Sequence, residues 1–146
     1  MTDFSESDLR AAFPPIPSGG NVVAVGIDVE SIARVRSAIE RHGHAFEEKV
    51  FTPEEIMFCR SRGNGQWASF AARWAAKEAF SKALGTGIGA EFAMTDAGIA
   101  CDGRGAPAFE LSMRAENALR SRGAEKALVS LTHTKDFAAA IVLFVA

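Results

Sequence analysis

An alanine-rich stretch over residues 66–84 carries one carboxylate and several cations immediately before a run of glycines. Glu78 and Lys82 are four residues apart and are therefore neighbours on one face of the predicted helix, with Arg73 and Lys77 upstream. A carboxylate and cations beside a glycine-rich turn are suited to holding a metal-bound phosphate. The same residues equally fit a surface helix with an ordinary ion pair and a glycine at its end. This segment alone leaves both interpretations open.

The glycine run, Gly85-Thr86-Gly87-Ile88-Gly89, predicts a helix end with a flexible exit. Its backbone N–H groups could also approach a phosphate closely. It is not a P-loop, because the Gly-Lys-Ser/Thr ending is absent and the glycines follow the helix instead of preceding it. The same order of elements rules out a dinucleotide-binding fingerprint. Chemistry on nucleoside triphosphates is therefore disfavoured.

A second acidic candidate is Asp28, which stands where the apolar stretch Val22–Val29 gives way to a helical pattern. A carboxylate at that position can cap the helix. It can also bind Mg²⁺, a hard cation that takes few carboxylates and completes its shell with water and substrate phosphate. Spacing along the chain cannot pair Asp28 with Glu78, so both interpretations stay open for Asp28.

Other reaction classes find little support in the remaining nucleophiles and bases. His133 follows an apolar stretch near the C-terminus, where a lone histidine is usually structural. No cysteine stands at a recognisable spacing from it, and Ser130 lacks the context of a nucleophile elbow. The chain's two cysteines, Cys59 and Cys101, have neither metal-ligand spacing nor the density of a disulfide framework. We expect both cysteines to be structural or incidental.

Three segments, in this order, resemble the holo-acyl-carrier-protein synthases, the small phosphopantetheinyl transferases. The resemblance runs from about Val22 to the C-terminus, and its long central block is the most specific part. The segments are Gly26-Ile27-Asp28 with Arg34 six residues on, Trp74-Ala-Ala-Lys-Glu-Ala-Phe-Ser-Lys-Ala-Leu-Gly-Thr-Gly87, and Thr132-His133-Thr134.

The resemblance implies transfer of 4′-phosphopantetheine from coenzyme A to a serine hydroxyl of apo acyl carrier protein, with adenosine 3′,5′-bisphosphate as the other product. Asp28 and Glu78 match the family's metal-binding acidic positions, so the resemblance makes them catalytic ligands of Mg²⁺ at the CoA pyrophosphate. Lys82 matches the lysine that contacts phosphate and neutralises charge during transfer. Glu78, directly or through a metal-bound water, is the favoured general base.

The resemblance also implies which residues contact CoA. Residues 132–134 match the segment that lines the CoA site, and phosphate contact is favoured over a role as general base for His133. Residues 103–107 match a turn near the adenine, from which Gly105 and Pro107 are carried over. Many relatives have lysine where this chain has Ala106, and Arg104 could compensate. The residues themselves add Arg73, which could bind a CoA phosphate or cover apolar surface with its stem, and the glycine run, whose backbone N–H groups could approach a phosphate. The expected CoA-binding set is Arg73, Lys82, Gly85, Thr86, Gly87, Gly105, Pro107, Thr132, His133 and Thr134.

Arg34 and Arg41 form the candidate surface for the carrier protein. Acyl carrier proteins of this pathway are acidic, and a basic helix face would steer and orient them. Arg34 matches a family position, whereas helix geometry alone places Arg41 beside it; a solvated polar face is the alternative. Family members of this size are typically homotrimers with active sites at subunit interfaces, so the resemblance implies a homotrimer here.

Alternating and helical patterns predict the elements that must position these residues. They predict a small α+β domain with mostly antiparallel strands and helices packed on one side. The resemblance implies that this domain has the 4′-phosphopantetheinyl transferase-like fold. Thr52-Pro53-Glu54-Glu55 predicts a capped helix start. Expected strands are 22–29, 99–101, 108–111, 127–132 and 138–144, and expected helices are 31–41, 53–60, 66–84 and 113–122. Residues 1–20, rich in proline and ending in Ser-Gly-Gly, are predicted to form a flexible extension before a single domain over 21–146.

Composition limits the partners. A net charge of −2 over 146 residues gives no support to nucleic-acid binding, which usually needs a strongly basic domain. The sequence shows neither a signal peptide nor a long apolar span, so we expect no membrane partner and a cytoplasmic location. Two alternatives to the transferase remain: another Mg²⁺-dependent phosphotransferase on the same fold, and a non-catalytic module that binds CoA or carrier protein.

Overall fold

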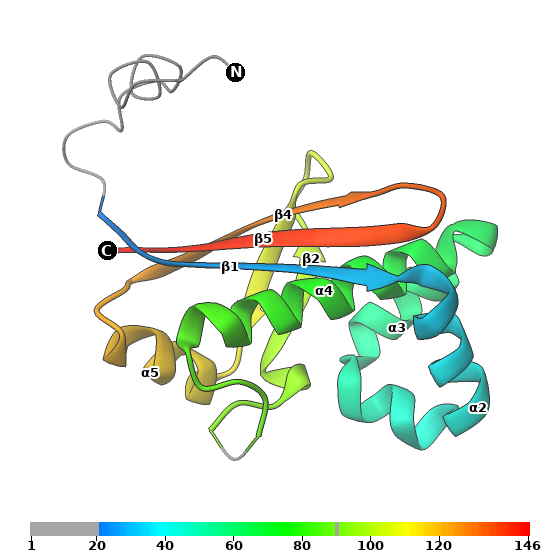
Figure 1. Ribbon diagram of the computed structural model, residues 1–146, viewed down its shortest axis with the longest axis horizontal. Coiled ribbons are helices and arrows are strands. Elements are labelled where there is room, and N and C mark those ends of the chain that lie inside the picture. The colour runs from blue at the N-terminus through cyan, green and yellow to red at the C-terminus, as the bar shows by residue number, and fades with distance from the viewer. Residues whose placement is uncertain (1–20, 90) are drawn as a thin grey trace, which may run out of the picture.

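The computed structural model describes residues 21–89 and 91–146, so the predicted extension over residues 1–20 lies outside the described residues. Figure 1 shows a three-stranded sheet with helices gathered on one side of it. The elements are β1 (Val22–Ser31), α2 (Ile32–Val50), α3 (Pro53–Arg60), η1 (Gly63–Gly65), α4 (Gln66–Leu84), η2 (Met94–Asp96), β2 (Ala97–Cys101), β3 (Pro107–Leu111), α5 (Met113–Ser121), β4 (Lys126–His133) and β5 (Phe137–Val145).

The strands form two antiparallel sheets, β1-β5-β4 and β2-β3. Helix α4 lies across the three-stranded sheet against β1 and β5 (Figure 1). Strands that alternate between core and surface residues need only one covered face, and the helices supply that cover. The prediction of an α+β domain with antiparallel strands and helices on one side is confirmed.

Small residues let α4 approach β1 closely. A Cβ atom added at Gly26 would lie 1.8 Å from the carbonyl oxygen of Ala79, so strand and helix meet backbone to backbone at this point. The alanines on this side of the helix, Ala75, Ala76, Ala79 and Ala83, are buried. The contact brings the side chains of neighbouring residues on β1 and α4 within reach of one another.

Several element boundaries differ from the sequence prediction. Strand β1 continues to Ser31, whose hydroxyl accepts a hydrogen bond from the Arg34 N–H and caps α2. Asp28 therefore lies inside the strand, and its interpretation as a helix cap is wrong. Helix α2 ends at Val50 instead of residue 41, although Gly43, at φ 72°, interrupts the helical geometry close to the expected end. A glycine reaches that conformation without the steric cost of other residues.

Other boundaries agree with the sequence. Thr52 and Glu55 form the expected capping box, with Pro53 in the first turn of α3. Helix α4 begins and ends where it was predicted to, and Gly85 closes it at φ 79°. These agreements reflect short-range signals that act within one turn of helix.

The outer face of the three-stranded sheet is apolar and exposed. Its most exposed large side chains on β1 are Val25, Ile27 and Val29, at 57%, 60% and 58%. Leu128 of β4 and Ile141 of β5 add to the same exposed apolar set. Side chains of a strand alternate between faces, so the other residues of β1 point toward α4. We call this surface, defined by Val25, Ile27, Val29, Leu128 and Ile141, the outer sheet face.

No helix among the described residues is both long and apolar enough to cross a membrane.

Candidate active site

Three carboxylates gather where β1 faces α4. Asp28 and Glu30 are two residues apart on β1 and so share a face of the strand, while Glu78 comes from α4. Burial, a side-chain hydrogen bond with Asp28 and the negative charges of Asp28 and Glu78 raise the pKa of Glu30 to about 7. Burial and the charge of Asp28 likewise raise the pKa of Glu78. The cluster therefore carries mutual repulsion that a bound cation or proton would relieve.

Lys82 is the cation nearest to this cluster. Its Nζ donates hydrogen bonds to Asp28 Oδ1 at 2.9 Å and to the Ile27 carbonyl oxygen at 3.1 Å. The hydrogen bond to Asp28 also raises the pKa of Lys82. The ion pair recorded for Lys82 is thus with Asp28 and not with Glu78, contrary to the ordinary i,i+4 pair that the sequence allowed.

The donor set fits a magnesium ion. Asp28 Oδ2 is buried and has no hydrogen-bond partner, although a buried carboxylate oxygen is normally satisfied. Mg²⁺ commonly takes one or two carboxylates and fills its remaining positions with water and substrate phosphate. Among the described residues, no group of three or more His, Cys, Asp or Glu side chains forms a metal site. Asp28 and Glu78 supply two carboxylates, a number that Mg²⁺ commonly takes from a protein.

A pocket of about 350 Å³ opens beside the N-terminal half of α4. Arg73 lines it, is only 4% exposed, and places its guanidinium 4.3 Å from the centre of the Phe58 ring. The Arg73 Nε has no hydrogen-bond partner among the described residues. A buried guanidinium with an unused donor at a pocket wall is suited to binding an anion such as phosphate.

This pocket, which we call the Arg73 pocket, brings together residues from distant parts of the chain. Of the expected CoA-binding set, five residues line it: Arg73, Gly105, Pro107, Thr132 and His133. Arg62, Phe58 and Cys101 also line it and were not expected from the sequence. The residues that the sequence assigned to CoA on separate segments thus share one cavity.

The other expected CoA contacts lie elsewhere. Gly85, Thr86 and Gly87 follow the C-terminal end of α4, twelve or more residues beyond Arg73, which is about 18 Å along a helix. Thr134 belongs to the β4–β5 turn, where its hydroxyl accepts a hydrogen bond from the Phe137 N–H at 3.2 Å. Within one chain, the glycine run and Thr134 are therefore outside the Arg73 pocket.

The β2–β3 turn shows how the pocket wall is shaped. Asp102 Oδ1 accepts hydrogen bonds from the backbone N–H groups of Arg104 and Ala106, and Gly105 has φ 84°. These contacts fix the turn before Pro107 without a lysine at position 106. Arg62 supplies a cation at the pocket wall in addition to Arg73.

Lys77 belongs neither to the carboxylate cluster nor to the Arg73 pocket, because its side chain is fully buried in a separate hydrogen-bond network. It donates to Glu55 Oε1 at 2.6 Å and to the carbonyl oxygens of Met94 and Ala97 at 3.0 and 2.9 Å. Glu55 Oε2 in turn accepts the Ile99 N–H at 3.2 Å. This buried pair ties α3 and α4 to the start of β2, the strand that ends at the Arg73 pocket.

Arg34 and Arg41 are both exposed on α2. The positive charge of Arg34 opposes, without reversing, the rise in the pKa of Glu30, so Arg34 interacts electrostatically with the carboxylate cluster. A pocket of about 710 Å³ opens at the start of this helix, lined by Ser31, Arg36, Trp67 and Phe137 among others.

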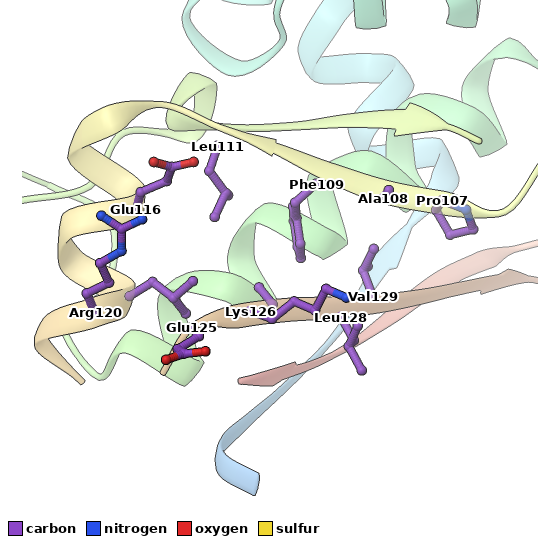
Figure 2. A pocket seen from close by; sticks show the side chains of 12 residues that line it. Pro107, Ala108, Phe109, Leu111, Glu116, Arg120, Glu125, Lys126, Leu128 and Val129 are labelled. Carbon is purple, nitrogen blue, oxygen red and sulfur yellow. The ribbon is translucent and has the colours of Figure 1, made fainter. Parts of the chain in front are cut away.

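A further pocket of about 420 Å³ lies between β3, β4 and α5. Figure 2 shows Phe109 and Leu111 of β3 opposite Lys126 and Val129 of β4, with Arg120 of α5 at one end. Of the residues that the sequence singled out for CoA, only Pro107 lines it. Asp28, Glu30 and Glu78 do not line it, so this pocket is separate from the carboxylate cluster.

The sequence profile of the family described as the 4′-phosphopantetheinyl transferase superfamily matches residues 24–142. The chain belongs to this superfamily. It is 45% identical over 116 residues to a "Holo-[acyl-carrier-protein] synthase" of Ruminiclostridium cellulolyticum, covering 80% of this chain and 87% of the relative.

Solved structures of holo-[acyl-carrier-protein] synthases are similar to this chain in fold. The crystal structure of the holo-[acyl-carrier-protein] synthase from Neisseria meningitidis superposes with a TM-score of 0.78 at 31% identity, over 85% of this chain and 98% of that one. The Helicobacter pylori synthase, solved in complex with coenzyme A, gives a TM-score of 0.72 at 34% identity, over 84% and 99%. The family resemblance stated from the sequence is thus confirmed.

The two charged residues of the site that the sequence did not point to, Glu30 and Arg62, were missed for different reasons. Glu30 could have been found from its two-residue spacing to Asp28, had the strand been extended by two residues. Arg62 stands in an irregular segment between α3 and η1, and no local pattern relates it to Arg73. Only the folded chain brings those two arginines to one pocket.

Proposed function

We propose that this chain is a holo-acyl-carrier-protein synthase, which transfers 4′-phosphopantetheine from coenzyme A to a serine of apo acyl carrier protein. The observation that carries the proposal is the pairing of Asp28 with Glu78 across the β1–α4 contact, with Lys82 on Asp28. Family membership and the Arg73 pocket support it. The second product is adenosine 3′,5′-bisphosphate.

The adenosine half of CoA is assigned to the Arg73 pocket. Arg73 and Arg62 supply positive charge for its phosphate groups, and Gly105 and Pro107 form the wall beside the base. Thr132 and His133 complete the lining, with His133 as a phosphate contact. The glycine run, Gly85 to Gly87, and Thr134 are retained as CoA contacts that one chain does not bring to this pocket.

Asp28 and Glu78 would hold Mg²⁺, which when bound neutralises negative charge at the CoA pyrophosphate. Glu78 accepts the proton of the carrier's serine hydroxyl as its oxygen attacks phosphorus. Lys82 keeps Asp28 oriented through its 2.9 Å hydrogen bond and adds positive charge beside the leaving group.

The carrier protein docks on α2 through Arg34 and Arg41. Both side chains are exposed, and α2 follows directly on the strand that carries Asp28. An acidic partner would be steered to such a surface, and its association would weaken as salt is raised. The α2 face therefore delivers the acceptor serine near the carboxylate cluster.

We further propose a homotrimer with active sites between subunits. The outer sheet face supports this, because an exposed apolar surface of this kind marks an interface more often than a free surface. A neighbouring subunit could also bring its glycine run or Thr134 toward the Arg73 pocket. Residues 21–146 form one domain in this assembly, preceded by the extension over residues 1–20. Two free cysteines and no bridge among the described residues fit a reducing, cytoplasmic setting.

The test is to mix the purified chain with CoA, MgCl₂ and apo acyl carrier protein and to read the intact mass of the carrier. The expected result is the gain of one phosphopantetheinyl group, which is lost when EDTA is added and restored by excess Mg²⁺. No gain with several apo carriers, despite measurable CoA binding, would contradict the proposal and favour a binding module. Transfer that continues in EDTA would contradict the assignment of Mg²⁺ but not the proposed transfer reaction.

A further inference from the structure

The two cysteines of the chain stand in opposite surroundings. Cys59 is completely buried in the core beside α4, and burial raises its pKa to about 12. Cys101 is exposed at the last position of β2 and is a free thiol. A buried thiol of this kind is inert, whereas an exposed one is open to reagents from solution. Any thiol chemistry of this chain therefore belongs to Cys101.

Cys101 lies on the wall of the Arg73 pocket, among the residues assigned to CoA. The Arg73 Nη2 is 4.0 Å from the Cys101 sulfur, at the long end of a hydrogen bond to sulfur. Arg73 is 4% exposed, and its Nε has no partner among the described residues. A buried guanidinium with an unused donor, next to an exposed thiol, favours an anionic reagent at this position.

We propose that Cys101 is a thiolation site through which an anionic low-molecular-weight disulfide switches off CoA binding. The Cys101 thiolate attacks one sulfur of the disulfide, the sulfur–sulfur bond of the reagent breaks, and one thiolate leaves. The product is a mixed disulfide that keeps one half of the reagent on the protein. An excess of a small thiol reverses the exchange and restores the free cysteine.

The expected consequence follows from the shared lining. An adduct on Cys101 extends into the same 350 Å³ that Arg73, Gly105 and His133 enclose. Its carboxylates would take up the Arg73 guanidinium that a CoA phosphate would otherwise contact. CoA and the adduct therefore exclude each other. This inference rests on the assignment of the Arg73 pocket to CoA.

The experiment begins with the untreated full-length chain, for which CoA binding is measured by calorimetry and transfer by the mass of the carrier protein. The chain is then incubated with glutathione disulfide, and peptide mapping locates the adduct. CoA binding is measured again before and after reduction with dithiothreitol. Cys101→Ser is the matched variant, because it retains Cys59; Cys59→Ala is the reciprocal variant. Each protein is compared with its own untreated sample.

We expect one glutathione per chain, on Cys101, with loss of CoA binding that dithiothreitol reverses. Saturating CoA should slow the modification, and Cys101→Ser should gain no adduct and lose no binding after treatment. An adduct on Cys101 that leaves CoA binding unchanged would overturn the proposal, as would an adduct formed only on Cys59. If Cys59→Ala does not fold, peptide mapping of the natural chain still decides between the two cysteines.

The two proposals fail in different ways. An untreated chain that binds CoA but transfers nothing contradicts the proposed function, while the binding measurements still test Cys101. An untreated chain that transfers normally, and continues to do so with Cys101 fully thiolated, contradicts the thiolation switch alone.

Discussion

At the residue scale, the carboxylates on β1 and α4 repel one another, and Lys82 offsets part of that repulsion through its ion pair with Asp28. Repulsion of this kind costs folding energy, as expected of groups placed for binding and not for stability. Burial and neighbouring negative charge raise the pKa values of both Glu30 and Glu78. The residues assigned to catalysis should therefore be replaceable without loss of the fold.

The first prediction concerns Glu78→Gln. We expect transfer to carrier protein to fall by at least about a hundredfold, the size of effect typical for loss of a general base. The free energy of unfolding should stay the same or rise, because the variant removes a negative charge beside Asp28. Turnover by carrier mass and denaturant unfolding measure the two quantities.

Glu110→Gln is the control for this variant, since Glu110 is exposed on β3 and faces neither the carboxylate cluster nor the Arg73 pocket. It should retain normal turnover. A folded Glu78→Gln chain with near-normal transfer would show that Glu78 is neither the base nor a metal ligand.

The sequence could reveal site residues that belong to a local motif, but not residues that only the packing of distant segments brings to the site. Arg73, Gly105, Pro107 and His133 were assigned to CoA from separate motifs, and they do share one pocket. No periodicity predicts that a loop arginine such as Arg62 would reach the same pocket, because its position is set by how α3 and η1 pack. The exposed thiol of Cys101 could not be distinguished from Cys59 by spacing alone.

At the scale of elements, the buried Glu55–Lys77 pair joins α3, α4 and β2. Both side chains are almost fully buried, and their Oε1–Nζ distance is 2.6 Å. The capping signal at Thr52 and the helix at Lys77 were each predictable from local sequence. Their connection was not, because the two charged residues are 22 positions apart and nothing local marks Lys77 as buried.

The second prediction is that Lys77→Met lowers the free energy of unfolding by about 3–5 kcal/mol, because it leaves the Glu55 carboxylate buried without a counter-charge. Adding Glu55→Gln to it should recover part of that loss, since the neutral amide is cheaper to bury. Denaturant titrations of both variants give the values. A loss under about 0.5 kcal/mol for the single variant, as is usual for surface positions, would show that the pair is not a tie between these elements.

The third prediction concerns Asp96, which joins η2 to α5. Burial alone would raise its pKa, but hydrogen bonds from the Ala93 N–H, Arg114 and Ser112 outweigh burial and lower the pKa below its usual 3.8. The ionised form therefore stabilises the fold, and that contribution is present above about pH 4 and lost as the pH falls through the lowered pKa.

Asp96→Asn is expected to lower the free energy of unfolding near neutral pH by about 1–3 kcal/mol, the range for hydrogen bonds to a charged group. The difference between the natural chain and the variant should shrink as the pH falls from 4 toward 2. Denaturant unfolding across that range measures it. A difference that stays constant with pH would mean that the Asp96 charge contributes nothing to the fold.

At the scale of the whole molecule, the outer sheet face presents exposed apolar side chains from three neighbouring strands to water. The antiparallel pattern itself was predictable from alternation along the strands, and it is confirmed. Alternation marks two faces of a strand but does not say which partner covers the second one. The folded chain shows that β1, β5 and β4 lie side by side with exposed apolar side chains. This arrangement indicates that another apolar surface covers the second face.

The fourth prediction is that Ile27→Glu dissociates the proposed homotrimer, because it buries a charge in an apolar interface. Sedimentation equilibrium of the variant should give the monomer mass, and transfer activity should fall with it. Met113→Glu is the matched control: Met113 is also apolar and is 77% exposed, but it lies on α5, away from the outer sheet face. If Ile27→Glu keeps the same trimer mass as Met113→Glu, the outer sheet face is excluded as the interface.

The two ends of the described domain meet at one end of the β1–β5 strand pair. The Ala146 N–H donates a hydrogen bond to the Asn21 carbonyl oxygen at 3.0 Å, and Figure 1 shows the C-terminus beside the start of β1. Asp28 is seven residues further along β1, about 23 Å away in an extended strand. A short peptide could therefore close residues 21–146 into a ring without reaching the carboxylate cluster. Backbone cyclisation would then raise the melting temperature by restricting the unfolded chain alone.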